Sequence, residues 1–262
     1  MALATCNQPS NAQIYAICSE AGGGKTSLAD TFPKAYFLNI EGATNTKSIR
    51  HWTKPPSTGK EITDAIRDFA TEKHDYKHLV FDSVTQIERI YQSDIVATEN
   101  GKPFVECCGG YGKSYEMLHQ RMREFAEVCR RLRDEKGYNV VWIFHATARE
   151  MELPGSPAFQ RWVPSLWYGK DGTKDNNLIF QSLADNWFHI RLDYETLSDG
   201  SDSGSKVEGD IIRRKVGVQA PLSRRVGTQP TTTYFAKNRL DLQGEVPFVF
   251  NQTPSFLRKD EK

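Results

Sequence analysis

The sequence predicts an α/β fold: a mostly parallel central sheet with helices on both faces and antiparallel strands added at the C-terminal side. Three observations lead to this prediction. Short apolar runs alternate with segments of helical periodicity as far as residue 144, which is the pattern of βαβ units. The run at residues 140–144 is apolar throughout, as in a parallel strand that is covered on both faces. A glycine-rich loop separates the first apolar run from the first helix.

The length and composition of the chain fit a single domain. A chain of 262 residues with 38% hydrophobic content can bury a full core. We expect a flexible segment at residues 1–12, one domain over residues 13–250 with a flexible serine- and glycine-rich loop at residues 198–210, and a tail at residues 251–262. Because the net charge is only +1, any nucleic-acid surface must come from local clusters of basic residues.

Cysteine usage and the absence of long apolar stretches bear on the compartment. Five cysteines, an odd number without C-x-x-C spacing, argue against a disulfide framework and against a zinc site. We expect them to be reduced thiols. The sequence has no apolar stretch of membrane-spanning length and no charged-then-apolar export signal near its start. The predicted location is therefore the cytoplasm, with no membrane partner.

The predicted elements alternate between strand and helix in the first part of the chain. Apolar residues repeat every three or four positions in the helical segments, whereas they form continuous runs in the strands. Proline and glycine mark the loops between them. In chain order the sequence predicts strands at residues 14–18, 35–40 and 78–82, a helix that opens at Ser27, a helix over residues 60–73, and a helix from Val84 to the break at residues 100–103.

The clearest helix follows a glycine-rich segment at residues 109–112. Its apolar positions lie three and four apart, and arginine and glutamate occupy its other face until Gly137 ends it. The apolar face consists of Tyr115, Leu118, Met122, Phe125, Cys129 and Leu132. After the strand at residues 140–144, the sequence pattern changes again. From residue 187 onward it consists of short strand-like segments. We expect antiparallel strands at residues 187–194, 211–218, 231–236 and 246–250.

The loop at residues 19–26 reads SEAGGGKT, a phosphate-binding loop (P-loop) in the strand, loop and helix context that it requires. Glycines let consecutive backbone N–H groups face one point, the ammonium of Lys25 reaches the outer phosphates, and the hydroxyl of Thr26 is a magnesium ligand. Ser19 stands where the usual pattern has glycine, and three glycines in a row supply compensating freedom. The sequence thus predicts a nucleoside triphosphate and Mg²⁺ as cofactors, with Gly22, Gly23, Gly24, Lys25, Thr26 and Ser27 around the phosphates.

Three further strand ends carry polar residues, and open parallel sheets bind ligands at these carboxyl ends. Asp82 follows an apolar strand, as does the carboxylate that supports magnesium in P-loop enzymes, although alone it would fit a helix N-cap equally well. Glu41 is either a turn acid or the general base that orients the attacking water. His145 is either a core histidine or a sensor of the γ-phosphate. The residues by themselves leave these last two choices open.

Five segments of the chain together resemble the RecA-type ATPases, and most of all the short phage-encoded members that consist of little more than the ATPase core. The segments are residues 22–26 (GGGKT), 37–42 (FLNIEG), 79–83 (LVFDS), 142–145 (WIFH) and 235–239 (FAKNR). The resemblance covers roughly residues 13–240. It implies a RecA-like P-loop NTPase fold, ATP hydrolysis, and a phage protein that acts in the cytoplasm of the host cell.

The resemblance also implies roles for individual residues. Glu41 corresponds to the catalytic glutamate, and His145 to a polar sensor that is often glutamine. Lys237 and Arg239 correspond to a basic pair that reaches the nucleotide of a neighbouring protomer, and Lys25 completes the predicted catalytic set. The implied partners are single-stranded DNA and further copies of the chain in a ring or filament, with a single-strand-binding protein as another candidate.

The candidate DNA-binding loop covers residues 147–177, directly after the His145 strand. It combines cations with aromatic rings, the mixture that single-strand binders use, although a lid or a protein interface would look similar. Its candidate residues are Arg149, Phe159, Arg161, Trp162, Trp167, Tyr168, Lys170 and Lys174. A second basic region at residues 211–240 contains no acidic residue, which suggests a surface that faces phosphates or acids.

The sequence therefore predicts an ATPase that assembles on single-stranded DNA and promotes annealing or strand exchange. Two alternatives stay open. A P-loop kinase for a small phosphate acceptor would use residues 149–174 as a lid with arginines. A nucleotide-gated binding module would use the aromatic segment to recruit a replication or recombination partner.

Overall fold

The computed structural model describes residues 12–42, 52, 54–152, 155, 157–169, 174–193, 196–197, 217–218 and 223–248. The strands are β1 (Ile14–Ser19), β2 (Ala35–Asn39), β3 (His78–Asp82), β4 (Asn139–Met151), β5 (Phe159–Pro164), β6 (Asn186–Asp193), β7 (Thr196–Leu197), β8 (Gly217–Val218), β9 (Ser223–Gly227) and β10 (Glu245–Pro247). The helices are α1 (Lys25–Ala29), α2 (Gly59–Thr71), α3 (Val84–Thr98), the 3-10 helix η2 (Phe104–Gly109), α4 (Lys113–Lys136) and α5 (Asn176–Leu183).

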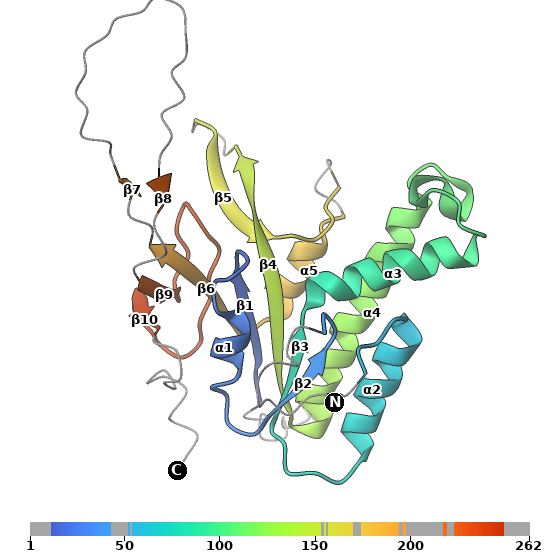
Figure 1. Ribbon diagram of the computed structural model, residues 1–262, viewed down its shortest axis with the longest axis horizontal. Helices are drawn as coiled ribbons and strands as arrows, with labels where there is room; N and C mark the ends of the chain where they lie inside the picture. Colours follow the sequence, from blue (N-terminus) through green and yellow to red (C-terminus); the bar gives the residue numbers. More distant parts are fainter. Residues whose placement is uncertain are drawn as a thin grey trace, which may run out of the picture.

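One sheet of eight strands organises the molecule (Figure 1). Its strand order is β10-β9-β6-β1-β4-β3-β2, and β5 pairs with β4 outside this path. The strands from β6 to β2 are parallel to one another, while β5, β9 and β10 pair antiparallel with their neighbours. A mostly parallel α/β sheet is thus confirmed, as are the predicted strands at residues 14–18, 35–40, 78–82 and 140–144.

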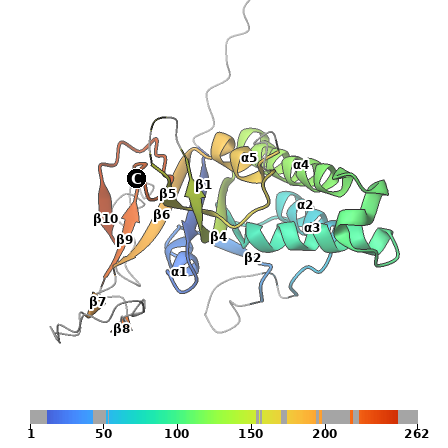
Figure 2. The ribbon, with the colours of Figure 1, turned by 90° about the horizontal axis from the view of Figure 1, so that it is seen from above.

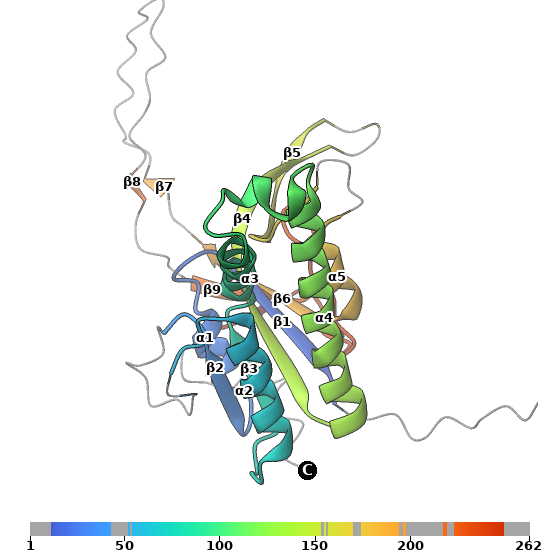
Figure 3. The same ribbon diagram turned by 90° about the vertical axis from the view of Figure 1, so that its right-hand side faces the viewer.

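Helices cover the two faces of the sheet unequally. Buried residues of α2, α3, α4 and α5 form one core cluster with the sheet, and Figure 3 shows α2, α3 and α4 side by side in front of it. The opposite face packs against Leu28 and Ala29 of α1, together with Phe32 and Phe248. Figure 2 shows α1 on the side away from the other helices. Helices therefore lie on both faces, but α1 is the only one on its face among the described residues.

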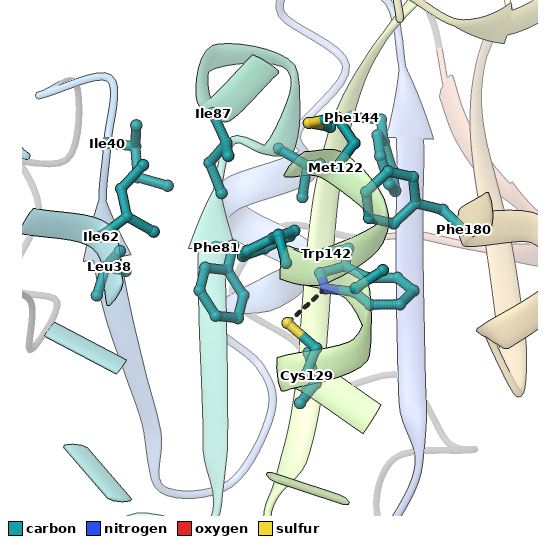
Figure 4. Packing of buried hydrophobic residues seen from close by; sticks show 14 of the residues in the cluster. Leu38, Ile40, Ile62, Phe81, Ile87, Met122, Cys129, Trp142, Phe144 and Phe180 are labelled. Carbon is teal, nitrogen blue, oxygen red and sulfur yellow. Dashed lines mark hydrogen bonds between the residues drawn. The ribbon is translucent and has the colours of Figure 1, made fainter. Parts of the chain in front are cut away.

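Helix α4 buries the apolar stripe that its sequence predicts. Leu118, Met122, Phe125, Cys129 and Leu132 are each at most 4% exposed. Figure 4 shows Met122 and Cys129 directed at Trp142 and Phe144 of β4, with Phe180 of α5 packed alongside. The indole Nε1–H of Trp142 donates to Cys129 Sγ at 3.4 Å, so the one polar atom of this buried ring has a partner. This packing fixes β4 and its neighbours beneath the helices.

The prediction of an antiparallel strand at residues 187–194 is wrong in part. β6 pairs in parallel with β1, and only its other edge is antiparallel, to β9. The cause is α5, which the sequence patterns missed. Its N-cap is Asp175, whose side chain accepts the backbone N–H of Asn177 at 2.8 Å. The helix returns the chain to the amino end of the sheet, from which β6 must run in parallel.

The prediction of a loop at residues 147–177 is also wrong in part. β4 continues beyond the sheet to Met151 and turns back as β5, with Ala146 to Met151 paired against Phe159 to Pro164. Figure 1 shows this hairpin rising past the ends of the other parallel strands. The extension follows from antiparallel pairing, because each backbone group that leaves the sheet finds a partner on the opposite strand.

The predicted strand at residues 231–236 is wrong, and the strand of this region is β9. Residues 231–234 form a turn instead: Thr231 N–H donates to the Tyr234 carbonyl at 3.0 Å. The Thr231 hydroxyl oxygen in turn accepts the N–H groups of Thr233 and Tyr234, both at 3.2 Å. Side chains of this type compete with strand pairing by satisfying nearby backbone donors.

Several predictions fall outside the described residues. They include the segment at residues 1–11, the loop at residues 198–210, the tail at residues 251–262, Lys170, and all of the strand at residues 211–218 except β8. Four cysteines are described, and Cys18, Cys107, Cys108 and Cys129 are all free thiols. No helix within the described ranges has the length and apolar character needed to cross a membrane.

Candidate nucleotide-binding site

The P-loop needs its three glycines for two reasons. Gly22 and Gly24 have φ angles of 77° and 96°, in the left-handed region that favours glycine. A Cβ on Gly23 would collide with the side chain of Ser19. Ser19 itself lies in β1, and its hydroxyl donates to the Glu20 carbonyl at 2.9 Å. Serine is therefore compatible with the position where the usual pattern has glycine, because the turn is made further along.

Lys25 lies folded into this loop. Its Nζ donates to the backbone oxygens of Ser19 at 3.1 Å and Glu20 at 2.8 Å. The side chain is buried, and burial lowers the pKa of Lys25, against the opposing charges of Asp82 and Glu41. A buried ammonium at the centre of the loop favours binding of an anion, because an anion offsets the loss of hydration.

Thr26 and Asp82 form the pair that could hold a metal ion. Thr26 Oγ1 donates to Asp82 Oδ2 at 2.8 Å, which joins the P-loop to the end of β3. Burial raises the pKa of Asp82, although the Thr26 hydrogen bond opposes the rise. Hydroxyl and carboxylate oxygens suit Mg²⁺ that shares its remaining positions with phosphates and water. The described residues contain no group of three or more His, Cys, Asp or Glu side chains that could hold a metal alone, so a metal shared with phosphates fits best.

Glu41 lies beside this pair at the end of β2. Its backbone N–H donates to the Asp82 carbonyl at 3.1 Å, and its Oε1 accepts hydrogen bonds from the Ser83 hydroxyl and from His145. Burial works against ionisation of the carboxyl, but the hydrogen bonds from His145 and Ser83 and the charge of Lys25 outweigh it. The pKa of Glu41 therefore lies below its usual value. The carboxylate is ionised near neutral pH and has a free oxygen with which to take a proton.

His145 is not a core histidine. It lies next to Ser19 in the register of β1 and β4, and its side chain reaches Glu41 with Nε2 at 2.9 Å from Oε1. Since an ionised carboxylate only accepts, Nε2 must carry the proton. The backbone N–H of His145 donates to Thr85 Oγ1 at 3.1 Å. Two residues of the first turn after β3, Ser83 and Thr85, thus connect Asp82, Glu41 and His145.

Lys237 and Arg239 lie away from this cluster. Lys237 pairs with Trp187, which is level with Ala16 in the middle of β1, and its Nζ donates to the Ala184 carbonyl at 2.7 Å. Arg239 forms an ion pair with Asp185 at 2.8 Å, and its side chain is 63% exposed. The basic pair is therefore at the amino end of β6, whereas the P-loop follows the carboxyl end of β1. Any role at the nucleotide of a neighbouring protomer stays a prediction.

The candidate DNA-binding residues divide into two groups. Within the chain, Trp167 stacks on Tyr115, Lys174 forms an ion pair with Glu116, and Arg161 donates to the Tyr234 carbonyl. These side chains already have internal partners. Arg149 and Tyr168 face solvent in part, with the guanidinium carbon of Arg149 3.2 Å from the centre of the Tyr168 ring. Trp162 is half-buried beside the turn at residues 231–234, and Phe159 is half-buried on the hairpin.

Sequence reasoning missed Glu88, a buried carboxylate on α3. Both of its oxygens accept the Trp167 backbone N–H at 3.0 Å, and Oε1 accepts Asn176 Nδ2 at 2.6 Å. Burial raises the pKa of Glu88 to about 7 despite these hydrogen bonds. A signal existed in the sequence, because Glu88 interrupts the buried stripe formed by Val84, Ile87, Tyr91 and Ile95. The residue ties the helix that follows Asp82 to the segment between β5 and α5.

The comparison with known families agrees with the position of the site. A family model described as an AAA domain matches residues 11–240. That span contains every site residue described above, from Ser19 to Arg239, and nearly coincides with the extent of the resemblance noted from the sequence. No curated protein gives a significant match to the chain.

Proposed function

This chain belongs to the AAA domain family, and from that premise we propose that it is an ATPase that acts on single-stranded DNA in the manner of a RecA-type recombinase. The family itself indicates a nucleotide-binding domain of the P-loop ATPase type. The proposal of ATP hydrolysis rests on one observation: five side chains converge at the ends of adjacent strands, namely Lys25, Thr26, Asp82, Glu41 and His145. These side chains supply a cation, two oxygen ligands for a metal and a base, which phosphoryl transfer to water requires.

In the proposed reaction, the P-loop glycines and Lys25 would hold the phosphates, and Thr26 and Asp82 would hold Mg²⁺. The metal, when bound, neutralises charge on the phosphates. Glu41 orients a water molecule and accepts its proton as the water oxygen bonds to the γ-phosphorus and the bond to ADP breaks. Ser83 keeps the Glu41 carboxylate ionised and fixed in orientation, and His145 does so only until the γ-phosphate is bound. His145 then exchanges this contact for the γ-phosphate, and so acts as a sensor.

The β4–β5 hairpin supports the proposal of DNA as the partner. One continuous strand, β4, carries His145 at the nucleotide site and the half-buried Arg149 on the hairpin, so the strand offers a direct path from His145 to this cation. Arg149 over the Tyr168 ring combines a charge for phosphate with a surface for base stacking. We propose that this end of the hairpin contacts the single strand. Assembly into a ring or filament, with Lys237 and Arg239 acting on a neighbour, belongs to the same proposal.

Steady-state ATP hydrolysis with single-stranded DNA, with duplex DNA and without DNA tests this function. Clear stimulation by the single strand is expected, and Lys25→Ala serves as the blank. Turnover that ignores DNA and responds to a small phosphate acceptor would replace the proposal with a P-loop kinase. Nucleotide binding without turnover under any condition would replace it with a nucleotide-gated binding module.

A further inference from the structure

A buried carboxylate that the proposed hydrolysis does not use lies close to the nucleotide site. Glu88 is 5% exposed and belongs to the second turn of α3. Its oxygens accept the Trp167 backbone N–H at 3.0 Å and Asn176 Nδ2 at 2.6 Å. Both donors lie in the chain that leads from β5 into α5, of which the structure describes residues 165–169 and 174–176 and which we call the connection. Glu88 therefore holds the connection against α3.

The connection also contacts β4 at His145. The Ser165 N–H donates to the His145 carbonyl at 2.7 Å, and the His145 N–H donates to Thr85 Oγ1 at 3.1 Å. Thr85 and Glu88 are three residues apart on α3, so they lie on the same face of the helix. These hydrogen bonds form a closed ring from α3 to β4, from β4 to the connection, and from the connection back to α3. Glu88 closes that ring.

One side of the ring reaches the nucleotide site. The Ser83 hydroxyl and the His145 ring both donate to Glu41. Ser83 is the N-cap of α3, and the Thr85 contact fixes the backbone of His145 to the first turn of the same helix. A displacement of this end of α3 therefore moves both donors relative to the Glu41 carboxylate.

The other side of the ring reaches the proposed DNA contact. Tyr168 follows Trp167 in the connection and is 44% exposed. The guanidinium of Arg149 covers one face of its ring. We propose that Glu88 is a positioning residue that couples the two sites. Through its contact with Trp167, it makes the alignment of Glu41 depend on where bound DNA holds Tyr168.

Loss of Glu88 would open the ring without touching the contacts of Glu41. Coupling between two sites is carried by the contiguous hydrogen bonds and rigid elements that connect them. Glu88 follows Ser83 by five residues, about 7.5 Å along a helix, so the part of α3 between them is short and rigid. Without Glu88, the connection keeps its Ser165 contact but no longer holds α3. We expect basal hydrolysis to persist and its response to DNA to be lost.

The inference rests on the proposed function, because it takes stimulation by single-stranded DNA from that proposal and assigns the residue that transmits it. The readout is the stimulation factor, the ratio of kcat for ATP hydrolysis with saturating oligothymidine to kcat without DNA. Fluorescence anisotropy gives Kd for the oligothymidine. Glu88→Ala should bring the stimulation factor close to one, with basal kcat and Kd unchanged. Glu88→Gln keeps an oxygen that can accept both donors, so it should keep most of the wild-type factor.

Asp94 provides the matched control on the same helix. Its Oδ2 accepts the Gly59 N–H at 2.7 Å, so it ties α3 to α2 as Glu88 ties α3 to the connection. Its partners Gly59 and Arg121 lie outside the ring. Asp94→Ala should therefore leave the stimulation factor at the wild-type value. Asn176→Ala removes one of the two donors to Glu88, and it should lower the factor less than Glu88→Ala does.

Hydrogen exchange in the wild-type protein tests the ring without any substitution. The Trp167 amide carries the proton that Glu88 accepts, so its exchange rate reports this contact. We expect the rate to change at least about fivefold when ADP is replaced by the non-hydrolysable analogue AMP-PNP in the presence of oligothymidine. The Gly59 amide, which Asp94 holds, should keep its rate. Equal rates at Trp167 in the two states would overturn the proposal.

The outcomes distinguish this inference from the function beneath it. If wild type hydrolyses no ATP, or if its turnover ignores DNA, the proposed function fails and the coupling proposal fails with it. If DNA stimulates wild type and Glu88→Ala equally, the coupling proposal is overturned and the proposed function stands. An equal fall of basal and stimulated kcat would show that Glu88 only supports the nucleotide site. Weaker oligothymidine binding with a normal stimulation factor would show that it only shapes the DNA surface, and either of these results also overturns the proposal.

Discussion

His145 and Glu41 are 104 positions apart in the chain, yet His145 Nε2 lies 2.9 Å from Glu41 Oε1. Ser83 donates its hydroxyl to the same carboxylate oxygen. Two donors on one oxygen leave the other oxygen of Glu41 available to a water molecule. The relationship places an ionised carboxylate beside the Thr26 and Asp82 pair, where the proposed hydrolysis requires a base.

Replacement of the P-loop lysine should abolish tight nucleotide binding. Lys25→Ala removes the ammonium that faces the phosphates, and charge-assisted hydrogen bonds of this kind contribute about 1.5–3 kcal/mol each. Kd for ATP should therefore rise about ten- to a hundredfold or more, as measured by calorimetry. Lys34→Ala, which changes a lysine with a half-exposed side chain beside Asp75, is the matched control and should bind as wild type does. Equal affinities for the two variants would contradict the assignment of the P-loop.

Loss of the Ser83 hydroxyl should shift the acidic limb of the pH–rate profile. Burial raises the pKa of Glu41, and the hydrogen bonds from His145 and Ser83 lower it. Ser83→Ala removes one of these bonds, so the pKa of the base rises and kcat begins to fall at a higher pH than in wild type. The measurement is kcat for ATP hydrolysis between pH 4 and pH 8.

Ser83 is also the N-cap of α3, so a control must separate the two roles. Thr58 is the N-cap of α2 and accepts the Glu61 N–H at 3.2 Å. Thr58→Ala should cost about 1 kcal/mol of stability, as loss of a cap does, without moving the acidic limb. If both variants shift the limb alike, the link between Ser83 and Glu41 has no part in catalysis.

The buried Glu88 predicts a stability that depends on pH. Its pKa is raised from 4.5 to about 7 in the folded chain, so the folded state binds the proton more tightly than the unfolded state. The contribution of this group is present below pH 4.5 and is lost as the pH rises to about 7. The loss amounts to roughly 3 kcal/mol. Urea unfolding of wild type and Glu88→Gln should differ by a free energy that changes across this window and is constant above it. A difference that is the same at every pH would contradict the assignment.

The hairpin predicts a contact of Arg149 with DNA phosphate. Arg149→Ala should weaken binding of single-stranded DNA and reduce the slope of log K against log salt by about 0.7, the value for one lost phosphate contact. Arg130 on α4 is held by Glu127 and Asp134, so Arg130→Ala is the matched control and should leave the slope unchanged. An unchanged slope for Arg149→Ala, measured by fluorescence anisotropy over a salt series, would remove the hairpin from the DNA interface.

The sequence could predict the parts of the site that lie at strand ends. Continuous apolar runs locate β1 to β4, and the parallel order that follows from βαβ units brings their carboxyl ends together, so the proximity of Lys25, Asp82, Glu41 and His145 could be predicted without a structure. The roles of Glu41 and His145 stayed open on this pattern alone and came from the resemblance. The contacts among them could not be found in this way. Whether the Ser83 hydroxyl donates to Glu41 depends on the backbone conformation at the start of α3. The apolar stripe of α3 marks Glu88 as an acid at a buried position, but it does not show which groups Glu88 contacts.

The C-terminal part was harder to predict because its strands are short and its pairings are long-range. Alternation in residues 187–194 fits either direction of pairing, and the direction was decided by α5, an eight-residue helix without a strong apolar stripe. Residues 231–236 resembled a short strand in the sequence. The Thr231 hydroxyl instead accepts backbone N–H groups of this segment, so they do not pair with a neighbouring strand.

The most direct test of the account is ATP hydrolysis by Glu41→Gln, measured beside ATP binding by the same variant in the presence of single-stranded DNA. The account predicts that the variant binds ATP with the affinity of wild type and that its kcat falls about 10²- to 10⁴-fold, the contribution of a positioned general base. Turnover equal to that of wild type, with ATP bound normally, would contradict the central claim that Glu41 activates water at this site.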